Sequence, residues 1–337
     1  MHDRAETAEL PGSTRAQKPV TEIPAPGNTV YAVIDSGTTR TRLRVWRDTQ
    51  VVWEAERRVG AARTASEGTG PLTLALSELL GEARGQVTLQ AVIASGMITS
   101  NVGLFEVPHL PAPASYSALA AGICRRDLPG LGEIYFVPGV KTLPGDHGSF
   151  FGDVLRGEEV EVVGLRELLG LQGEVSFMHY GSHHKLVRTD DQGLLGSLTT
   201  LGGELLGALL GHTILASGTA ALSTLGEIDR EWWNRGWAAG EQDGFARAAF
   251  SGRLAGQLLR ASPEQVTAFL LGAVSQQDAV LLEGTAPLVL YGHASFTGPV
   301  AGRLRQEGRD VRVASAEMSE RAAALGAVRL FERSAYA

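Results

Sequence analysis

Several short polar segments of the sequence contain residue types that suit phosphate chemistry, and the first is Asp35-Ser-Gly-Thr-Thr39. An apolar stretch ends here in a carboxylate, and a turn of small residues follows. Such a turn offers backbone N–H groups and the hydroxyl groups of Thr38 and Thr39 to phosphate oxygens. Asp35 could orient Mg²⁺ on those phosphates or accept hydrogen bonds from the turn, and both alternatives stay open. A P-loop is excluded because no Gly-Lys pair occurs in the sequence.

The second segment, Arg156-Gly-Glu-Glu159, begins a predicted helix after a glycine-rich stretch. A glutamate at this position could be the general base that removes a proton from a substrate hydroxyl group. Arg156 could bind a substrate carboxylate or the phosphate in transfer. Carboxylates in the first turn of a helix also interact favourably with the helix dipole, so a purely structural role for Glu158 and Glu159 stays open.

The third segment, Gly181-Ser-His-His-Lys185, combines a hydroxyl group, two imidazoles and a lysine, a residue type that is scarce in this chain. Neighbouring strand residues point to opposite faces of a sheet, so at most one of His183 and His184 is expected to face a site. Zinc is not expected, because no further ligands are spaced for it. A solvated strand entry is the alternative to a functional role, and it is weakened because the apolar residues Val175, Phe177 and Met178 lead directly into the segment.

Two further glycine-rich stretches are weaker candidates. The loop at residues 292–298, which includes Gly292 and Ser295, follows an apolar strand and could let a ring lie against its backbone. Ser100 and Asn101 stand between two glycines, and they could bind sugar hydroxyl groups or cap the local turn.

The elements that must position these segments form a pattern that occurs twice. Strand, small-residue turn, strand, turn, strand and helix are predicted over residues 30–83 and again over residues 175–210. Two similar lobes built in this way would place the first and third segments opposite each other across a cleft. The stretch at residues 60–70 is predicted to be a polar loop. Alternating strands and helices near the end of the chain indicate an α/β fold.

Composition limits the classes of function. The 337 residues allow two domains, and we expect a disordered tail at residues 1–28 and lobes at residues 29–172 and 173–337. A net charge of -7 argues against nucleic acid and anionic membranes as partners. The single cysteine excludes a disulfide within the chain. No apolar run reaches the length of a membrane span, so a cytoplasmic protein is expected.

Taken in order, four motifs resemble those of the 2-dehydro-3-deoxygalactonokinases, a family of the sugar kinase, actin and Hsp70 superfamily. They are Asp35-Ser-Gly-Thr-Thr39, Ser95-Gly-Met97 with Ser100-Asn-Val-Gly103, Asp153-Val-Leu-Arg-Gly-Glu-Glu159, and Gly181-Ser-His183 with Lys185. The first motif alone indicates only the superfamily. The resemblance implies an α/β fold with two actin-like, ribonuclease H-like lobes around a central cleft.

The resemblance also implies a reaction, the transfer of the γ-phosphate of ATP to the 6-hydroxyl group of 2-dehydro-3-deoxy-D-galactonate with Mg²⁺, in galactonate catabolism. Glu158 resembles the catalytic base of this superfamily, acting with Asp35 and Arg156, and Asp35 would hold the Mg²⁺ through water. The implied nucleotide contacts are Asp35, Gly37, Thr38, Thr39, Gly181, Ser182, Gly292 and Ser295. The implied contacts to a small sugar acid are Ser100, Asn101, Arg156, Glu159, His183 and Lys185.

The chain departs from the family pattern in two places. Val160-Glu161 stands where the family often has Thr-Gln, and Tyr180-Gly-Ser-His-His-Lys-Leu186 stands where it has Pro-Gly-Thr-His-x-Lys-Trp. Because serine keeps the hydroxyl group, phosphate binding is expected to persist, while the acceptor could be another sugar or keto-sugar acid. A nucleotide-binding sensor without turnover is a further alternative. The sequence leaves the oligomeric state open, a homodimer included.

Overall fold

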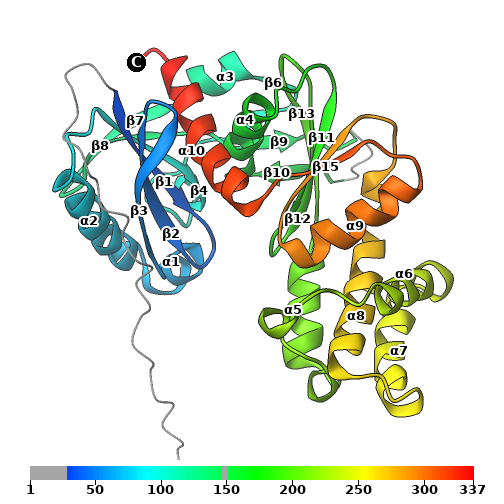
Figure 1. Cartoon of the computed structure of the whole chain (residues 1–337). Helices are drawn as coiled ribbons and strands as arrows, with labels where there is room; N and C mark the ends of the chain where they lie inside the picture. Colours follow the sequence, from blue (N-terminus) through cyan, green and yellow to red (C-terminus); the bar gives the residue numbers. More distant parts are fainter. Residues whose placement is uncertain (1–28, 146–150) are drawn as a thin grey trace, which may run out of the picture.

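The protein, a computed structural model, is described over residues 29–145 and 151–337. The predicted tail at residues 1–28 and part of the glycine-rich stretch before Asp153 lie outside these ranges. Within them, two six-stranded sheets and one three-stranded sheet are accompanied by helices. Figure 1 shows the two large sheets on either side of the central helices α4 and α10.

The first large sheet carries the turn that follows Asp35. Its strand order is β3-β2-β1-β4-β8-β7, and β1 pairs antiparallel with β2 and parallel with β4. Every residue of β1 except Asp35 is buried, which explains its apolar sequence. The strands are β1 (Val30–Ser36), β2 (Thr41–Arg47), β3 (Gln50–Arg57), β4 (Ala91–Gly96), β7 (Cys124–Leu128) and β8 (Gly132–Phe136).

The second large sheet carries the turn that contains Ser182. Its strand order is β15-β14-β11-β12-β13-β6, and β11 pairs antiparallel with β12 and parallel with β14. The strands are β6 (Ala114–Ser115), β11 (Val175–Tyr180), β12 (His184–Thr189), β13 (Gly193–Thr200), β14 (Leu288–Gly292) and β15 (Val311–Val313).

The two large sheets share one arrangement. In each, three antiparallel strands form a meander, and two parallel strands continue the sheet from the first strand of that meander. The order β3-β2-β1-β4-β8 in one sheet thus corresponds to β13-β12-β11-β14-β15 in the other. The predicted α/β fold with two similar lobes is confirmed. The lobe boundary at residues 172 and 173 stays a prediction.

A small sheet, in the order β10-β9-β5, leads the chain into the second polar segment. Asp153 at the start of β10 accepts hydrogen bonds from the backbone N–H of Thr199 at 2.6 Å and from its hydroxyl group at 2.8 Å. Since Thr199 belongs to β13, the approach to Arg156 is tied to the second large sheet. The strands are β5 (Leu110–Pro111), β9 (Val140–Thr142) and β10 (Asp153–Leu155).

Helices lie between the sheets and around them, and α5, α6, α7 and α8 form a bundle beside the second sheet (Figure 1). The α-helices are α1 (Ala61–Glu67), α2 (Gly70–Arg84), α3 (Tyr116–Ala121), α4 (Glu158–Leu168), α5 (Gly202–His212), α6 (Arg230–Asp243), α7 (Phe245–Leu258), α8 (Pro263–Gln277), α9 (Ala294–Gln306) and α10 (Ala316–Glu332). Short 3₁₀ helices are η1 (Met97–Thr99), η3 (Ala216–Gly218), η4 (Leu222–Thr224) and η5 (Ala279–Leu282).

The prediction of a polar loop at residues 60–70 is wrong, because this stretch contains α1. The helix has only two buried residues, Ala61 and Thr64, and therefore no apolar periodicity that the sequence could reveal. Its first N–H groups donate hydrogen bonds to the carbonyl groups of the first polar turn. Tertiary contact, rather than local sequence pattern, thus accounts for this helix.

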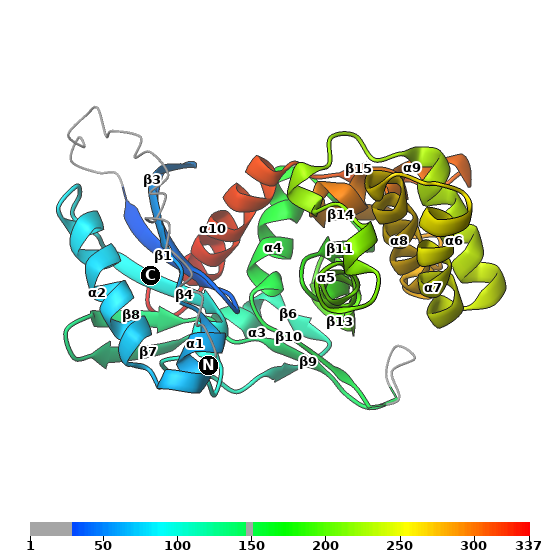
Figure 2. The ribbon, with the colours of Figure 1, turned by 90° about the horizontal axis from the view of Figure 1, so that it is seen from below.

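Helices α4 and α10 pack together between the large sheets, as Figures 1 and 2 show. A Cβ atom on Gly164 would lie 1.9 Å from the carbonyl oxygen of Ala322, and one on Gly326 would lie 1.8 Å from that of Val160. Only glycine permits this approach. Helix α10 also contacts β1 and β4 of the first sheet and β14 of the second. The start of α4, which carries Glu158, is therefore fixed relative to both sheets.

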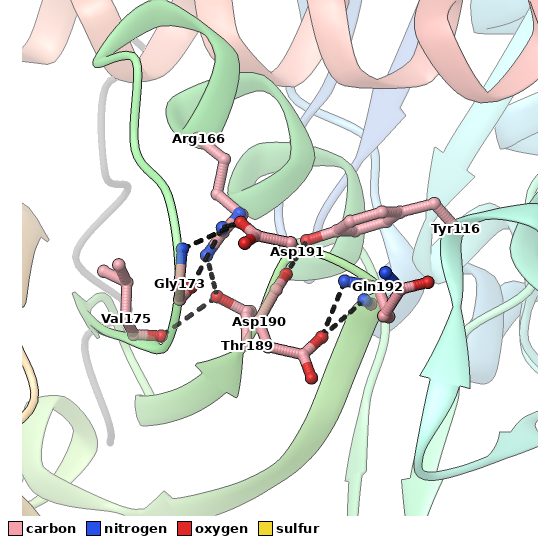
Figure 3. A network of polar contacts seen from close by, with 9 residues as sticks. Tyr116, Arg166, Gly173, Val175, Thr189, Asp190, Asp191 and Gln192 are labelled. Atoms are coloured by element: carbon pink, nitrogen blue, oxygen red, sulfur yellow. Dashed lines mark hydrogen bonds and ion pairs between the residues drawn. The ribbon is translucent and has the colours of Figure 1, made fainter.

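The other end of α4 is held by the polar network in Figure 3. The buried guanidinium group of Arg166 donates hydrogen bonds to Thr189 Oγ1 and to Asp191 Oδ1, both at 2.8 Å. The hydroxyl group of Tyr116 donates to the carbonyl oxygen of Asp190 at 3.1 Å. Because Thr189 ends β12, the network anchors α4 to the second sheet.

No single helix in the described ranges is long and apolar enough to cross a membrane. The segments Gly202–His212 and Ala216–Thr224 meet the criteria of length and composition only together, as a pair bent by 81°.

Candidate active site

A cavity of about 200 Å³ brings the polar segments of both lobes together. Thr38 from the first turn and Ser182 from the second both line it, so the two turns face one hollow. Glu158, Arg156, His183 and Lys185 line it as well. The complete set is Asp35, Ser36, Gly37, Thr38, Gly96, Met97, Arg156, Gly157, Glu158, Glu161, His179, Ser182, His183 and Lys185.

The first turn is held from behind by α1. The N–H group of Ala61 donates to the carbonyl oxygen of Gly37 at 3.0 Å, and that of Ala62 donates to the carbonyl oxygen of Thr38 at 2.9 Å. The N–H groups of Thr38 and Thr39 make no hydrogen bond with any described residue. Because α1 occupies the carbonyl groups, the turn presents N–H groups and hydroxyl groups, which suit an anion.

Asp35 is the second-last residue of β1 and lies beside this turn. Its side chain is 33% exposed, and Oδ2 lies 3.9 Å from Arg44 Nη1. Mg²⁺ usually keeps several waters and takes one or two carboxylates together with phosphate oxygens. No cluster of three or more metal-ligating side chains occurs among the described residues. The partly exposed carboxylate of Asp35 therefore fits Mg²⁺ held through water beside a phosphate, rather than a cage made of protein alone.

The second turn is held by α5 in the same manner. The N–H group of Glu204 donates to the carbonyl oxygen of Ser182 at 2.8 Å. A Cβ atom on Gly203 would lie 2.1 Å from the carbonyl oxygen of Gly181, so the start of α5 presses directly on the turn. The N–H groups of Gly181, Ser182 and His183 form no hydrogen bond within the described ranges.

The two adjacent histidines have different surroundings. His183 lines the cavity, and its Nε2 lies 3.1 Å from Glu204 Oε1. His184 is fully buried, and its Nδ1 lies 2.6 Å from Oδ2 of the buried Asp278. One imidazole of the pair therefore faces the site, as strand alternation predicts.

Glu158 stands at the start of α4 between two groups from the second lobe. Its Oε2 lies 3.1 Å from Lys185 Nζ and accepts a hydrogen bond from the backbone N–H of Arg156 at 3.1 Å. Its Oε1 lies 3.9 Å from His179 Nδ1. Burial acts to raise the pKa of Glu158, but Lys185 and then His179 outweigh it and hold the pKa below its usual value. The carboxylate is therefore ionised near neutral pH, as a general base must be.

Close backbone contacts set the separation of Glu158 from the first turn. Gly157 has φ of 112°, which favours glycine, and a Cβ atom there would lie 3.3 Å from the Cα atom of Gly96. Gly96 has φ of 83°, and its Cβ atom would lie 2.5 Å from the carbonyl oxygen of Ser36. The backbone at the start of α4 therefore lies in direct contact with the end of β4, which in turn contacts the end of β1.

Arg156 lines the cavity, but protein groups occupy much of its guanidinium. Nη2 donates to the carbonyl oxygen of Val107 at 2.8 Å and lies 3.1 Å from the ring nitrogens of His109, while Nη1 contacts Thr99. Burial, followed by the charge of Arg156, lowers the pKa of His109 to about 4, so the imidazole is neutral at pH 7. These contacts fix Arg156 to the loop after β4, and its contact with a substrate stays a prediction.

Two more carboxyl groups follow Glu158 on α4. Glu159 is fully buried and does not line the cavity, and its Oε2 accepts a hydrogen bond from the N–H of Gly157 at 2.6 Å. Burial, then repulsion by Glu158, raises the pKa of Glu159 to about 7. Glu161 does line the cavity, although the sequence analysis gave it no role. Its place three residues after Glu158 on a helix is the signal that could have shown a shared face.

Four predicted contacts stand apart from the cavity-lining residues. The hydroxyl group of Ser100 donates to the carbonyl oxygen of Met97 at 2.7 Å, which corresponds to the turn-capping alternative, and Asn101 is exposed beside it. Gly292 ends β14 beside Tyr180, just before the second turn, and Ser295 lies in the first turn of α9. The roles of these residues in binding sugar or nucleotide stay predictions.

Sequence reasoning also missed His179, which lines the cavity from the end of β11. Its ring stacks on Tyr291, with 4.8 Å between ring centroids. His179 lies inside an otherwise apolar strand, so its pattern suggested core. Thr39 and Gly181, which were predicted to bind nucleotide, adjoin lining residues without being among them.

A second cavity, of about 250 Å³, lies among α7, the start of α8 and η3. None of the predicted site residues lines it. Its one charged lining residue, Arg253, donates a hydrogen bond to the carbonyl oxygen of Ile214 at 3.2 Å. The smaller cavity between the lobes is therefore the candidate active site.

The two lobes and the cleft between them define an α/β protein of the actin-like fold. The crystal structure described as a 2-dehydro-3-deoxygalactonokinase protein of Sinorhizobium meliloti matches with a TM-score of 0.72 and 23% identity, covering 89% of this chain and 98% of that chain. Component A of the (R)-2-hydroxyglutaryl-CoA dehydratase of Acidaminococcus fermentans matches with a TM-score of 0.51 and 13% identity, covering 90% and 98%. These likenesses concern the fold alone.

The chain belongs to the 2-keto-3-deoxy-galactonokinase family, whose sequence profile matches residues 35–329. The 2-dehydro-3-deoxygalactonokinase of Escherichia coli K12 is 29% identical over 189 residues, which are 56% of this chain and only 59% of that protein. A relative of Rhizobium meliloti strain 1021 that carries the same enzyme name is 27% identical over 314 residues, which are 89% of this chain and 96% of the relative.

Proposed function

We propose that the chain is an ATP-dependent kinase that transfers the γ-phosphate of ATP to the 6-hydroxyl group of 2-dehydro-3-deoxy-D-galactonate. The observation that carries this proposal is the single cavity bounded by both polar turns and by the ionised Glu158. The enzyme names of the relatives suggest the acceptor. The reaction would be a step of galactonate catabolism in the cytoplasm, where ATP is available.

The two turns would hold the phosphate groups of ATP. Unpaired N–H groups at Thr38, Thr39, Gly181 and Ser182 support this role, because such groups bind anions without a formal charge. Asp35 would hold Mg²⁺ through water, and the ion would neutralise charge on the phosphates. Gly292 and Ser295, one strand away from the second turn, would contact adenosine.

Glu158 would act as the general base. Its carboxylate takes the proton from the acceptor hydroxyl group while that oxygen bonds to the γ-phosphorus and the bond to ADP breaks. Lys185 supports the role by keeping the carboxylate ionised.

The acceptor would be positioned by Ser100, Asn101, Arg156, Glu159, His183 and Lys185. Among these, Arg156, His183 and Lys185 line the cavity and carry or can carry positive charge, which suits a sugar acid. Closure of the lobes would exclude water, so that the acceptor hydroxyl rather than water receives the phosphate.

The release of ADP from ATP over a panel of sugars and sugar acids tests the proposal. We expect 2-dehydro-3-deoxy-D-galactonate to give the highest kcat/KM. A higher value for a different acid would correct the acceptor, and ATP binding without ADP release on any member would indicate a sensor.

The substitution Glu158→Gln tests the base. We expect kcat to fall about 10²- to 10⁴-fold, while the Kd for ATP changes less than about threefold, because only proton transfer is lost. Glu167→Gln is the matched control, since Glu167 lies on the same helix but is exposed and paired with Arg329. A fully active Glu158→Gln enzyme would move the base assignment to another carboxyl group.

A further inference from the structure

Glu161 is a cavity-lining carboxyl group for which the proposed mechanism has no use. It lies three residues after Glu158 on α4, so the two side chains share one face of the helix, with Cβ atoms about 5–6 Å apart. The close contacts of Gly164 and Gly326 lock α4 against α10. The helix therefore cannot rotate to carry Glu161 out of the cavity.

The polar atoms around Glu161 are only partly satisfied by the protein. Glu161 Oε2, Tyr291 Oη and His179 Nδ1 are buried, and none makes a hydrogen bond of ordinary geometry with a described residue. The phenol of Tyr291 acts on the carboxyl group of Glu161, and His179 Nδ1 lies 3.9 Å from Glu158 Oε1. Tyr291 is 1% exposed, and its ring stacks on that of His179. A buried polar group without a partner costs about 1–3 kcal/mol. A ligand that supplies hydrogen bonds here would recover that free energy.

Within the described part of the chain, no basic side chain forms an ion pair with Glu161. Lys185, which lines the same cavity, is paired with Glu158 instead. Burial first, and then the charges of Glu158 and Asp35, raise the pKa of Glu161 well above its usual value, and Tyr291 opposes them only in part. A carboxyl group that keeps its proton can donate a hydrogen bond as well as accept one. A hydroxyl group, which also does both, is its natural partner.

We propose that Glu161, backed by Tyr291, binds a second hydroxyl group of the acceptor, beside the hydroxyl group that Glu158 deprotonates. The inference rests on the proposed kinase function. With Cβ atoms about 5–6 Å apart, the two side chains can each form a hydrogen bond of about 2.7 Å and so bracket two hydroxyl groups on neighbouring or next-neighbouring carbons. The acceptor class is thereby narrowed to polyhydroxy acids with a free hydroxyl group close to the reacting one.

Two variants of Glu161 and one control separate this role from a structural one. Glu161→Gln keeps a donor and an acceptor at nearly the same volume, whereas Glu161→Leu removes both. Glu167→Leu makes the same change at an exposed position of α4. Melting temperatures establish that all three variants fold.

The acceptors are 2-dehydro-3-deoxy-D-galactonate and its analogues that lack the 4-hydroxyl or the 5-hydroxyl group. We expect the wild-type enzyme to prefer the parent compound over one of these analogues by about 30-fold in kcat/KM. Glu161→Leu should lower kcat/KM for the parent by about 30-fold and leave that analogue within about threefold, while Glu161→Gln and Glu167→Leu stay within about threefold for both. The KM for ATP should change less than about twofold in every variant.

Equal losses on parent and analogues in Glu161→Leu, or an impairment of Glu161→Gln as large as that of Glu161→Leu, would overturn the inference. Calorimetric binding of the same acids separates it from the proposed function. Wild-type binding without ADP release would refute the kinase proposal alone, and the Kd values of the variants would still decide the role of Glu161. Failure of the wild-type protein to bind any of the acids would overturn both.

Discussion

The two turns that face the cavity are built alike and equipped differently. Each joins two antiparallel strands, and each has carbonyl groups held by the first N–H groups of a helix, α1 in one lobe and α5 in the other. The first turn adds the carboxylate of Asp35, whereas the second adds His183 and Lys185. In the proposed function the repeated backbone would thus offer two anion sites, and the side chains would distinguish a turn that faces Mg²⁺ from one that faces the acceptor.

The comparison shows that the backbone and the side chains contribute differently to the site: both turns have backbone N–H groups that are free within the described ranges, but their charged side chains differ. Where backbone N–H groups bind the anion, a single hydroxyl group contributes little, so loss of Ser182 Oγ should matter less than loss of a charge. Asp35 is the carboxylate that adjoins the first turn, whereas the other carboxyl groups of the cavity lining, Glu158 and Glu161, belong to α4.

The largest expected effect contrasts Asp35→Asn with Ser182→Ala. We expect Asp35→Asn to lower kcat/KM by roughly 100-fold or more and to raise the Mg²⁺ concentration needed for activity, because the carboxylate would hold the ion. Ser182→Ala should lower kcat/KM less than about fivefold. Steady-state kinetics over a Mg²⁺ series measures both, and equal losses would mean that the turns are equivalent in function.

The next effect compares the helix starts behind the turns. A Cβ atom on Gly203 would lie 2.1 Å from the carbonyl oxygen of Gly181, and one on Gly60 would lie 2.6 Å from that of Gly37. We expect Gly203→Ala to lower the free energy of unfolding by about 2–3 kcal/mol and Gly60→Ala by about 1–2 kcal/mol, since backbone must move in both. Urea unfolding measures the difference.

Gly207→Ala is the matched control for these glycine variants, because it lies on α5 and a Cβ atom there would meet open space. Replacing a helical glycine by alanine should stabilise the protein by about 0.5–1 kcal/mol. If Gly203→Ala also stabilised the protein, the close contact between α5 and the second turn would be refuted.

A smaller effect concerns the contact between lobes that Lys185 makes with Glu158. Lys185 lowers the pKa of Glu158, so Lys185→Met should raise it and leave the base protonated up to a higher pH. The acidic limb of the pH profile of kcat/KM should therefore move to higher pH, with a greater loss at about pH 6 than at about pH 9. An unmoved limb in a folded variant would remove Glu158 as the group that titrates there.

The smallest effect is expected at the partly exposed pair of His183 and Glu204, whose side chains are 38% and 56% exposed. His183→Ala should change the free energy of unfolding by less than about 0.5 kcal/mol, because exposed ion pairs contribute little. The KM for the sugar acid should rise about threefold if His183 contacts it. Thermal unfolding and acceptor titration measure the two quantities, and a large loss of stability would show that the second turn depends on its side chains.

The parts of the fold and site that follow from local pattern could be predicted from the sequence. The turns after β1 and β11 and the helix that begins at Glu158 are of this kind, because apolar strands and small residues mark them. Helix α1 could not be predicted, since its stability comes from contact with a distant turn. The ion pair between Glu158 and Lys185 joins residues from different elements, so only packing reveals it.

His179 and Glu161 show why the predicted site was incomplete. His179 lies in a strand whose other residues are mostly apolar, so its neighbours suggest core although its ring reaches the cavity. Glu161 was missed because Glu158 and Glu159, just before it in the sequence, had already been assigned to the site. Which two of the three carboxyl groups face the cavity depends on how α4 is rotated against α10, and the sequence of α4 alone does not determine that rotation.

The packing of α4 against α10 has a consequence for the synthesis of the chain. Since α10 follows every other described helix and strand along the chain, the segments of both sheets leave the ribosome before the helix that packs against α4 has been made. A nascent chain stalled before residue 316 would lack the helix that fixes α4 and, with it, the proposed base Glu158. The proposed activity would therefore require α10 to be in place.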